Sequence, residues 1–148
     1  MSARTKARKR ALDVLFAADV RGETQEQALE AEALRAAARP ERASSWPYAR
    51  DIVQGVIDHE DEIDLLITRH STSWPIDRMP AVDRGILRIA VWEARYNPEV
   101  PVGVAVDEAV ELAKELSTDD SPKFVNGLLM AIVRDEDEIG RASCRERV

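Results

Sequence analysis

The chain has 148 residues, a length that fits one domain and can bury one sizeable core or two small ones. Hydrophobic residues make up 45% of it and charged residues 33%, whereas aromatic residues make up only 5%. Alanine, leucine, glutamate and arginine are plentiful, which favours helices and argues against a β-sandwich or barrel. The formal net charge of −7 argues against a protein that coats nucleic acid without specificity.

The sequence also lacks the features of membrane-spanning, secreted and disulfide-rich proteins and of metal and phosphate-loop sites. No apolar run approaches the roughly 18–20 residues of a membrane span, and no signal peptide follows the basic N-terminus, so we expect a cytoplasmic protein. One cysteine, Cys144, excludes a disulfide framework, and His59 and His70 have no metal-ligand spacing. The glycines form no phosphate-binding loop. We therefore expect no catalytic residue, no metal and no cofactor.

Apolar residues recur at helical spacing in six segments. The first is closed by Gly22, and Thr24 with Gln27 has the pattern of a capping box at the start of the second. The predicted helices span about 4–20, 24–38, 47–70, 79–97, 102–116 and 120–138.

No segment keeps the alternation of a strand, because the nearest candidate, residues 100–106, is interrupted by Pro101. Short connections predict antiparallel neighbours, with a division near residues 71–75. We expect an all-α fold and a single domain over residues 1–139, with three-helix sub-bundles at about 4–70 and 76–138. Residues 140–148 lack apolar periodicity and are predicted to be a disordered tail or a cloning remnant.

Positive charge is concentrated in the first ten residues, which include Arg4, Lys6, Arg8, Lys9 and Arg10 but no acidic residue. Basic groups at a helix N-terminus oppose the macrodipole, and like charges one turn apart repel each other. This unfavourable arrangement indicates that an anion binds there, and phosphate groups suit guanidinium forks. The alternative is a solvated, frayed helix end.

The second half of the chain contains the blocks ILRIAVWE, VPVGVAVDEAVELAK and DSPKFVNGLL. Together with the pattern R-x-K-A-R-x-x-A-L-x-x-L-F near the N-terminus, they closely resemble the NusB family of bacterial transcription antitermination factors. The resemblance covers residues 4 to about 134, and its most specific part is the D-S-x-K-F-V-N-G-x-L segment.

The resemblance implies two packed three-helix bundles and an RNA-binding protein that is not an enzyme. It implies binding to boxA-type single-stranded RNA of nascent ribosomal transcripts, together with the small-subunit ribosomal protein NusE. The complex would load onto RNA polymerase with other Nus factors and suppress termination. The implied RNA-binding residues on the first helix are Arg4, Lys6 and Arg8, and more loosely Lys9 and Arg10. Those at the start of the last helix are Asp120, Ser121, Lys123, Phe124 and Asn126.

Several of these positions have a second interpretation. Asp120 could accept a hydrogen bond from a base or cap the last helix, and Phe124 could stack on a base or belong to the core. Asn126 and Gly127 could serve close helix packing. Glu93 lies in an apolar run, where we expect it to pair with Arg84, Arg88 or a helix N-terminus and to have a structural role, not a catalytic one.

Two other functions remain open at this point. Similar domains recruit RNA for cytosine methyltransferases, although such an enzyme needs a further catalytic domain. A helical adaptor is the other alternative, in which a homodimer masks the RNA surface.

Overall fold

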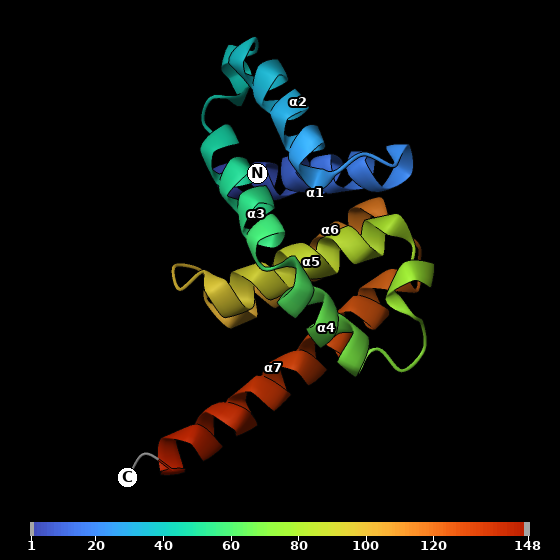
Figure 1. Ribbon diagram of the computed structural model, residues 1–148, viewed down its shortest axis with the longest axis vertical. Coiled ribbons are helices and arrows are strands. Elements are labelled where there is room, and N and C mark those ends of the chain that lie inside the picture. Colours follow the sequence, from blue (N-terminus) through green and yellow to red (C-terminus); the bar gives the residue numbers. More distant parts are fainter. Residues whose placement is uncertain (1, 147–148) are drawn as a thin grey trace.

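The computed structural model describes the backbone of residues 2–146 and the side chains of residues 2–135. Within this part of the chain the structure is entirely helical, with seven α-helices, two short 3-10 helices and no strand, which confirms the predicted all-α fold (Figure 1). The elements are α1 (Ala3–Arg21), α2 (Gln25–Ala37), η1 (Pro40–Arg42), α3 (Trp46–Asp58), α4 (Glu60–His70), η2 (Ile76–Arg78), α5 (Ala81–Tyr96), α6 (Val102–Leu116) and α7 (Ser121–Glu146).

The predicted helix ends around residue 22 are confirmed. Gly22 has a left-handed backbone (φ 67°) that ends α1, a conformation that glycine adopts without steric cost. Thr24 and Gln27 form the predicted capping box, in which each side chain bonds to the other residue's backbone N–H.

The predicted helix over residues 47–70 is two helices, because the chain bends at His59. The backbone of His59 is not helical (φ −120°, ψ 20°), and its imidazole stacks on the Tyr96 ring at 3.8 Å between centroids. The next three residues, Glu60, Asp61 and Glu62, form the first turn of α4, where negative charge interacts favourably with the helix dipole.

The bend also changes how the helices are grouped. Helices α1, α2 and α3 pack on one another, whereas α4 packs on α5 and α7. Two side-chain pairs hold α4 there, Arg88 with Asp64 at 2.9 Å and His70 with Asp135 at 2.9 Å. The predicted division near residues 71–75 is therefore corrected to His59.

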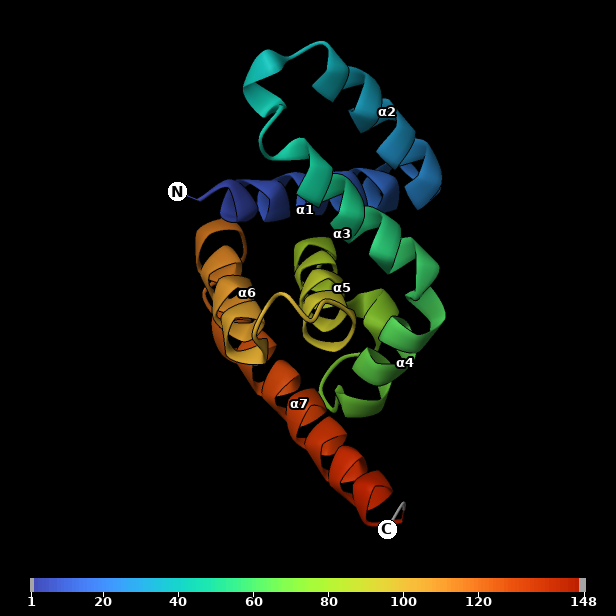
Figure 2. The same ribbon diagram turned by 90° about the vertical axis from the view of Figure 1, so that its left-hand side faces the viewer.

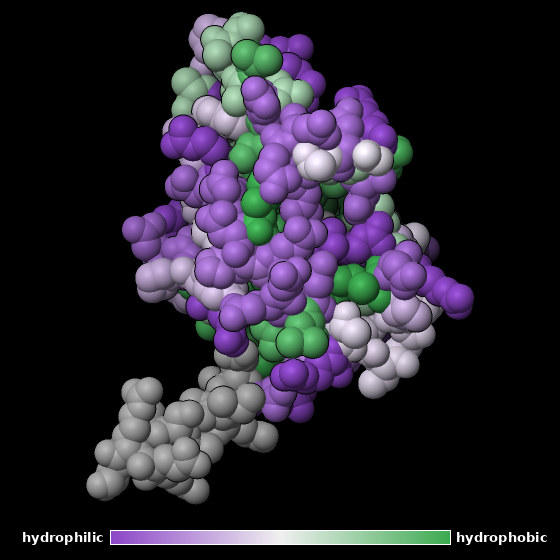
Figure 3. Space-filling view, viewed as in Figure 1, coloured by the Kyte–Doolittle hydropathy of each residue, from purple (hydrophilic) through white to green (hydrophobic). Residues whose placement is uncertain are grey.

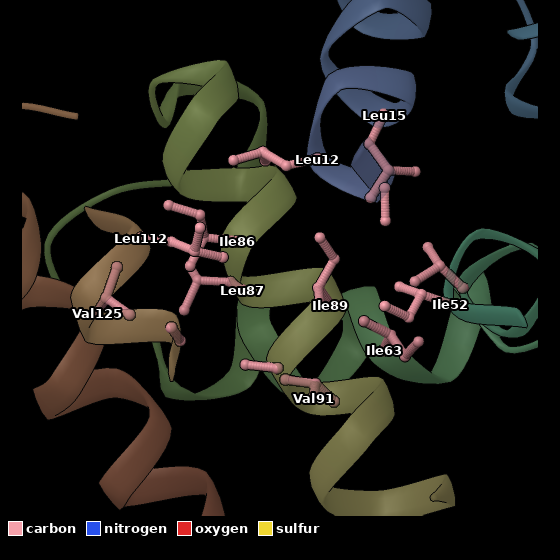
Figure 4. Packing of buried hydrophobic residues seen from close by; sticks show 14 of the residues in the cluster. Leu12, Leu15, Ile52, Ile63, Ile86, Leu87, Ile89, Val91, Leu112 and Val125 are labelled. Carbon is pink, nitrogen blue, oxygen red and sulfur yellow. The ribbon is translucent and has the colours of Figure 1, made fainter. Parts of the chain in front are cut away.

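Helix α5 lies at the centre of the molecule, and α1 crosses above the ends of α5 and α6 (Figure 2). Apolar side chains of α1, α3, α4, α6 and α7 converge on α5, among them Leu15, Ile63 and Val125 (Figure 4). Apolar and charged residues of α5 are buried around nearly its whole circumference, as expected for a helix enclosed by others. The face seen in Figure 3 is mainly hydrophilic, with small separate apolar patches.

Helix α7 continues to Glu146, past the predicted end near residue 138. The side chains after Asp135 lie outside the described residues, and the proposed origin of residues 140–148 stays a prediction. None of the helices is long and apolar enough, over the part that the structure describes, to cross a membrane.

Candidate nucleic-acid interface

The basic residues of α1 fall on different sides of the helix, and Arg8 lies on the buried side. Its side chain is only 3% exposed and forms a bidentate pair with Glu93 of α5, with Nε at 2.8 Å and Nη2 at 2.9 Å from the carboxylate oxygens. Glu108 of α6 lies 3.6 Å from the same guanidinium. The guanidinium of Arg8 is thus engaged by carboxylates, and its predicted RNA-facing position is corrected to a buried one.

Two further side chains complete this buried cluster. The Tyr48 hydroxyl donates to Glu93 at 2.5 Å, and Asn97 donates to the Tyr48 oxygen at 3.1 Å. Burial alone would lower the pKa of Arg8, but its hydrogen bond to Glu93 and the nearby carboxylates outweigh that effect and raise the pKa. Glu93 therefore has the structural role predicted for it, although its partner is Arg8 and not an arginine of its own helix.

Burial, followed by hydrogen bonding to Glu93 and the charge of that carboxylate, raises the pKa of the Tyr48 phenol. The unfolded chain would lose this proton near pH 10, before the folded chain does. The stability that Tyr48 contributes is therefore present below about pH 10 and is lost as the pH rises further. We expect urea denaturation to show a steeper fall in unfolding free energy above pH 10 for the wild type than for Tyr48→Phe. Parallel curves for the two proteins would contradict this assignment.

Three other basic residues near the start of α1 also have partners in the protein. Arg4 pairs with Glu99 at 3.2 Å, and Lys9 pairs with Glu115 at 2.5 Å. Arg10 is half-buried and donates to the Ser45 hydroxyl at 3.3 Å. Acidic groups from α5, α6 and their connection thus offset much of the unfavourable charge that the sequence places at the start of α1.

Lys6 differs from the neighbouring basic residues in its side-chain contacts. It is exposed, and no hydrogen bond or ion pair of its side chain occurs among the described residues. Arg4 keeps 45% of its side chain exposed and Lys9 keeps 22%, while both are held by carboxylates at the surface. Exposed pairs of this kind are worth roughly 0–1 kcal/mol, so a phosphate can replace the carboxylate at little cost. In the N-terminal half of α1, the basic groups most available to an anion are therefore Lys6, Arg4 and Lys9.

The start of α7 has a buried side and an exposed side. Ser121 is only 2% exposed and donates to Asp83 at 2.9 Å, and Ser117 donates to the other carboxylate oxygen of Asp83 at 2.5 Å. The predicted RNA-facing position of Ser121 is thus corrected to a buried one. Asp119 and Asp120 are exposed, and neither side chain caps the helix or has another partner among the described residues.

The remaining predicted residues of α7 are accessible to different degrees. Lys123 and Asn126 are exposed, with no polar partner in the part of the chain that the structure describes. Phe124 is half-buried, and its ring lies 5.4 Å from that of Trp74. Gly127 is exposed, with no atom of another element near its missing Cβ. Asn126 and Gly127 therefore do not serve close helix packing.

The two predicted elements lie near each other through the end of α6. Lys9 of α1 contacts Glu115, which precedes the turn from α6 into α7. Figure 2 shows the end of α6 below the N-terminal half of α1, with α7 beginning behind it. Lys9 thus lies near the turn that leads to Asp120, Lys123 and Asn126, whereas Arg4 lies near Glu99 at the opposite end of α6. No group of His, Cys, Asp and Glu side chains suited to a metal ion occurs among the described residues.

Comparison with known proteins decides the family. The NusB family model matches residues 5–134. The chain belongs to the NusB family. It is 59% identical over 132 residues to the transcription antitermination protein NusB of Clavibacter sepedonicus, covering 89% of this chain and 96% of that protein. The identity to NusB of Leifsonia xyli is also 59%, over 140 residues, covering 95% of this chain and 97% of the relative.

Solved NusB structures share the fold. The structure of T. maritima NusB superimposes with a TM-score of 0.76 at 35% identity, covering 88% of this chain and 90% of that one. A crystal structure of the antitermination factors NusB and NusE in complex with dsRNA gives a TM-score of 0.77 at 31% identity. That match covers 91% of this chain and 98% of the NusB-like one. The resemblance seen in the sequence is therefore confirmed across nearly the whole domain.

Proposed function

We propose that this protein is a transcription antitermination factor that binds boxA-type single-stranded RNA of nascent ribosomal transcripts. It acts together with ribosomal protein NusE and joins RNA polymerase with other Nus factors, in the cytoplasm and without catalysing a reaction. The observation that carries this proposal is the match of this chain, over 91% of its length, to a NusB protein solved with NusE and dsRNA. Relatives matched over almost their entire length are named antitermination proteins, which favours this function over a methyltransferase module.

The geometry supports a restricted set of RNA contacts. Lys6 and Lys123 have no competing partner among the described side chains and are suited to phosphate groups. Arg4 and Lys9 can exchange a surface carboxylate for phosphate, and Asn126 and Asp120 can reach base edges. The acidic remainder of the protein repels the RNA backbone and confines binding to the surface that carries these basic groups.

Fluorescence anisotropy tests the proposed function. We expect boxA-type RNA to bind more tightly than a scrambled RNA of equal length, and added NusE to strengthen only the specific complex. Equal, weak and strongly salt-dependent binding of both RNAs would contradict it, because that behaviour is purely electrostatic. Sedimentation of the same samples shows whether a homodimer of this chain dissociates when RNA and NusE bind.

Lys6 provides the sharpest single-residue test. If it contacts one phosphate, Lys6→Gln should weaken binding and reduce the slope of log affinity against log salt by about 0.7. Arg39→Gln is the matched control, because it also removes one exposed positive charge but lies in the turn after α2. Equal effects of the two variants would mean that only net charge matters and that Lys6 makes no specific contact.

A further inference from the structure

A pocket of about 250 Å³ lies between the α4–α5 connection and the start of α7. Two aromatic rings line it, those of Trp74 and Phe124, which meet at 5.4 Å with an interplanar angle of 53°. Trp74 is 44% exposed although it is a large apolar side chain. The pocket is smaller than the roughly 300–1,000 Å³ of sites for drug-sized ligands, so it suits a single planar ring.

The wall that carries Trp74 is held in place by hydrogen bonds. The Ser71 hydroxyl donates to the Trp74 carbonyl at 2.5 Å. Further along the same connection, Arg84 of α5 donates to the carbonyls of Ile76 at 2.8 Å and Met79 at 3.2 Å. A ligand that stacks on Trp74 would therefore meet a preformed surface and would not have to order a loose loop.

The polar wall of the pocket offers acceptors and negative charge. The exposed carboxylate of Asp120 has no partner among the described residues, and the Thr118 hydroxyl lies beside it in the lining. Asp83 is buried and already accepts hydrogen bonds from Ser117 and Ser121, so it mainly adds negative charge to this wall. A phosphate group is disfavoured beside two carboxylates, whereas an aromatic ring that bears an N–H donor is favoured.

We propose that this pocket binds one unstacked nucleobase, with Trp74 as the stacking surface and Asp120 as the acceptor for an exocyclic amine. Cytosine carries such an amine, and its N4 is a known partner for carboxylates, whereas uracil presents a carbonyl oxygen at that position. The pocket would thus discriminate between bases, while the lysines contact the backbone. This inference rests on the proposed RNA-binding function and adds Trp74, which lies outside the residues that the family resemblance implied.

The test uses the full chain with short oligo(C) and oligo(U) RNA, monitored by anisotropy and by quenching of tryptophan fluorescence. We expect oligo(C) to bind more tightly than oligo(U). Because the stacking of one base is lost, Trp74→Ala should bind oligo(C) roughly 5- to 150-fold more weakly. The salt slope should be unchanged, because no phosphate contact is lost. Trp74→Phe should retain most of the affinity, and Asp120→Asn should reduce the preference for oligo(C), because an amide can also donate to uracil.

Control measurements separate stacking from a structural role. Trp46, half-buried at the start of α3, lies outside the pocket, and Trp46→Ala should leave oligo(C) affinity unchanged. Thermal melts establish that each variant is folded at the assay temperature. Wild-type affinity in Trp74→Ala, or equal losses in Trp74→Ala and Trp74→Phe, would overturn the base pocket while boxA binding still supports the proposed function. Failure of the wild type to bind any of these RNAs would overturn both.

Discussion

Replacing Gly55 with alanine should destabilise the protein by about 1–3 kcal/mol, although alanine is the better helix former. Gly55 lies in α3 where it faces α5, and a Cβ atom there would be only 1.9 Å from Nε1 of the Trp92 indole. The indole is half-buried and packs beside the Tyr48 ring at 6.4 Å, so it cannot move aside without disturbing that contact. Urea or thermal denaturation measures the loss directly.

Two comparisons isolate the steric cause. Gly127→Ala, in an exposed and open part of α7, should stabilise the protein by up to about 1 kcal/mol, because only the helix propensity changes. In a Trp92→Ala background the atoms that clash are absent, so Gly55→Ala should become neutral or stabilising. The prediction is wrong if Gly55→Ala destabilises equally in both backgrounds.

The sequence predicted those features of the fold that depend on neighbouring residues. The capping box of Thr24 and Gln27 and the left-handed Gly22 are local motifs with a local cause, and both were predicted in place. The bend at His59 was missed because apolar residues continue at helical spacing on both sides of it. The run Glu60, Asp61 and Glu62 was the available signal, since three acidic residues together favour the first turn of a new helix.

The candidate site was harder to predict because it depends on contacts between distant parts of the chain. The basic start of α1 predicted a bound phosphate, which stays a prediction, and for Arg8, Arg4 and Lys9 the structure supplies carboxylates of its own. Two observations in the sequence could have shown the buried pair. Arg8 lies one turn before Leu12, on the edge of the apolar stripe of α1. Glu93 lies within an apolar run and carries the opposite charge. Neither observation identifies the partner, which is 85 positions away.

The pocket beside Trp74 could not be predicted from the sequence for the same reason. In sequence it is an isolated tryptophan in a connection between helices, with no periodic pattern that assigns it a face. Its role in the pocket depends on Phe124 and Asp120, which the fold brings beside it from the start of α7. Periodicity can assign residues to the core or the surface of one helix, but it cannot show which surfaces of different elements form one pocket.

The buried pair of Arg8 and Glu93 should give the largest effect of a single substitution. Arg8→Leu leaves the Glu93 carboxylate buried, with only the Tyr48 hydroxyl to satisfy it. Removing one member of a buried ion pair typically costs about 3–5 kcal/mol. At roughly 2–4 °C per kcal/mol for a chain of this size, the melting temperature should fall by about 10 °C. The double variant Arg8→Leu with Glu93→Leu should regain most of this loss, because no uncompensated charge remains.

The double variant also separates the structural role of Arg8 from RNA binding. Since the guanidinium is enclosed by Glu93 and Glu108, its removal in a folded protein should leave the affinity for boxA-type RNA and the salt slope unchanged. If Arg8 instead leaves its pocket to contact a phosphate, the double variant should lose about 0.7 in salt slope, as expected for Lys6→Gln. Binding measured on Lys6→Gln and on the double variant at the same temperature therefore distinguishes a basic residue that holds α1 on the core from one that binds RNA.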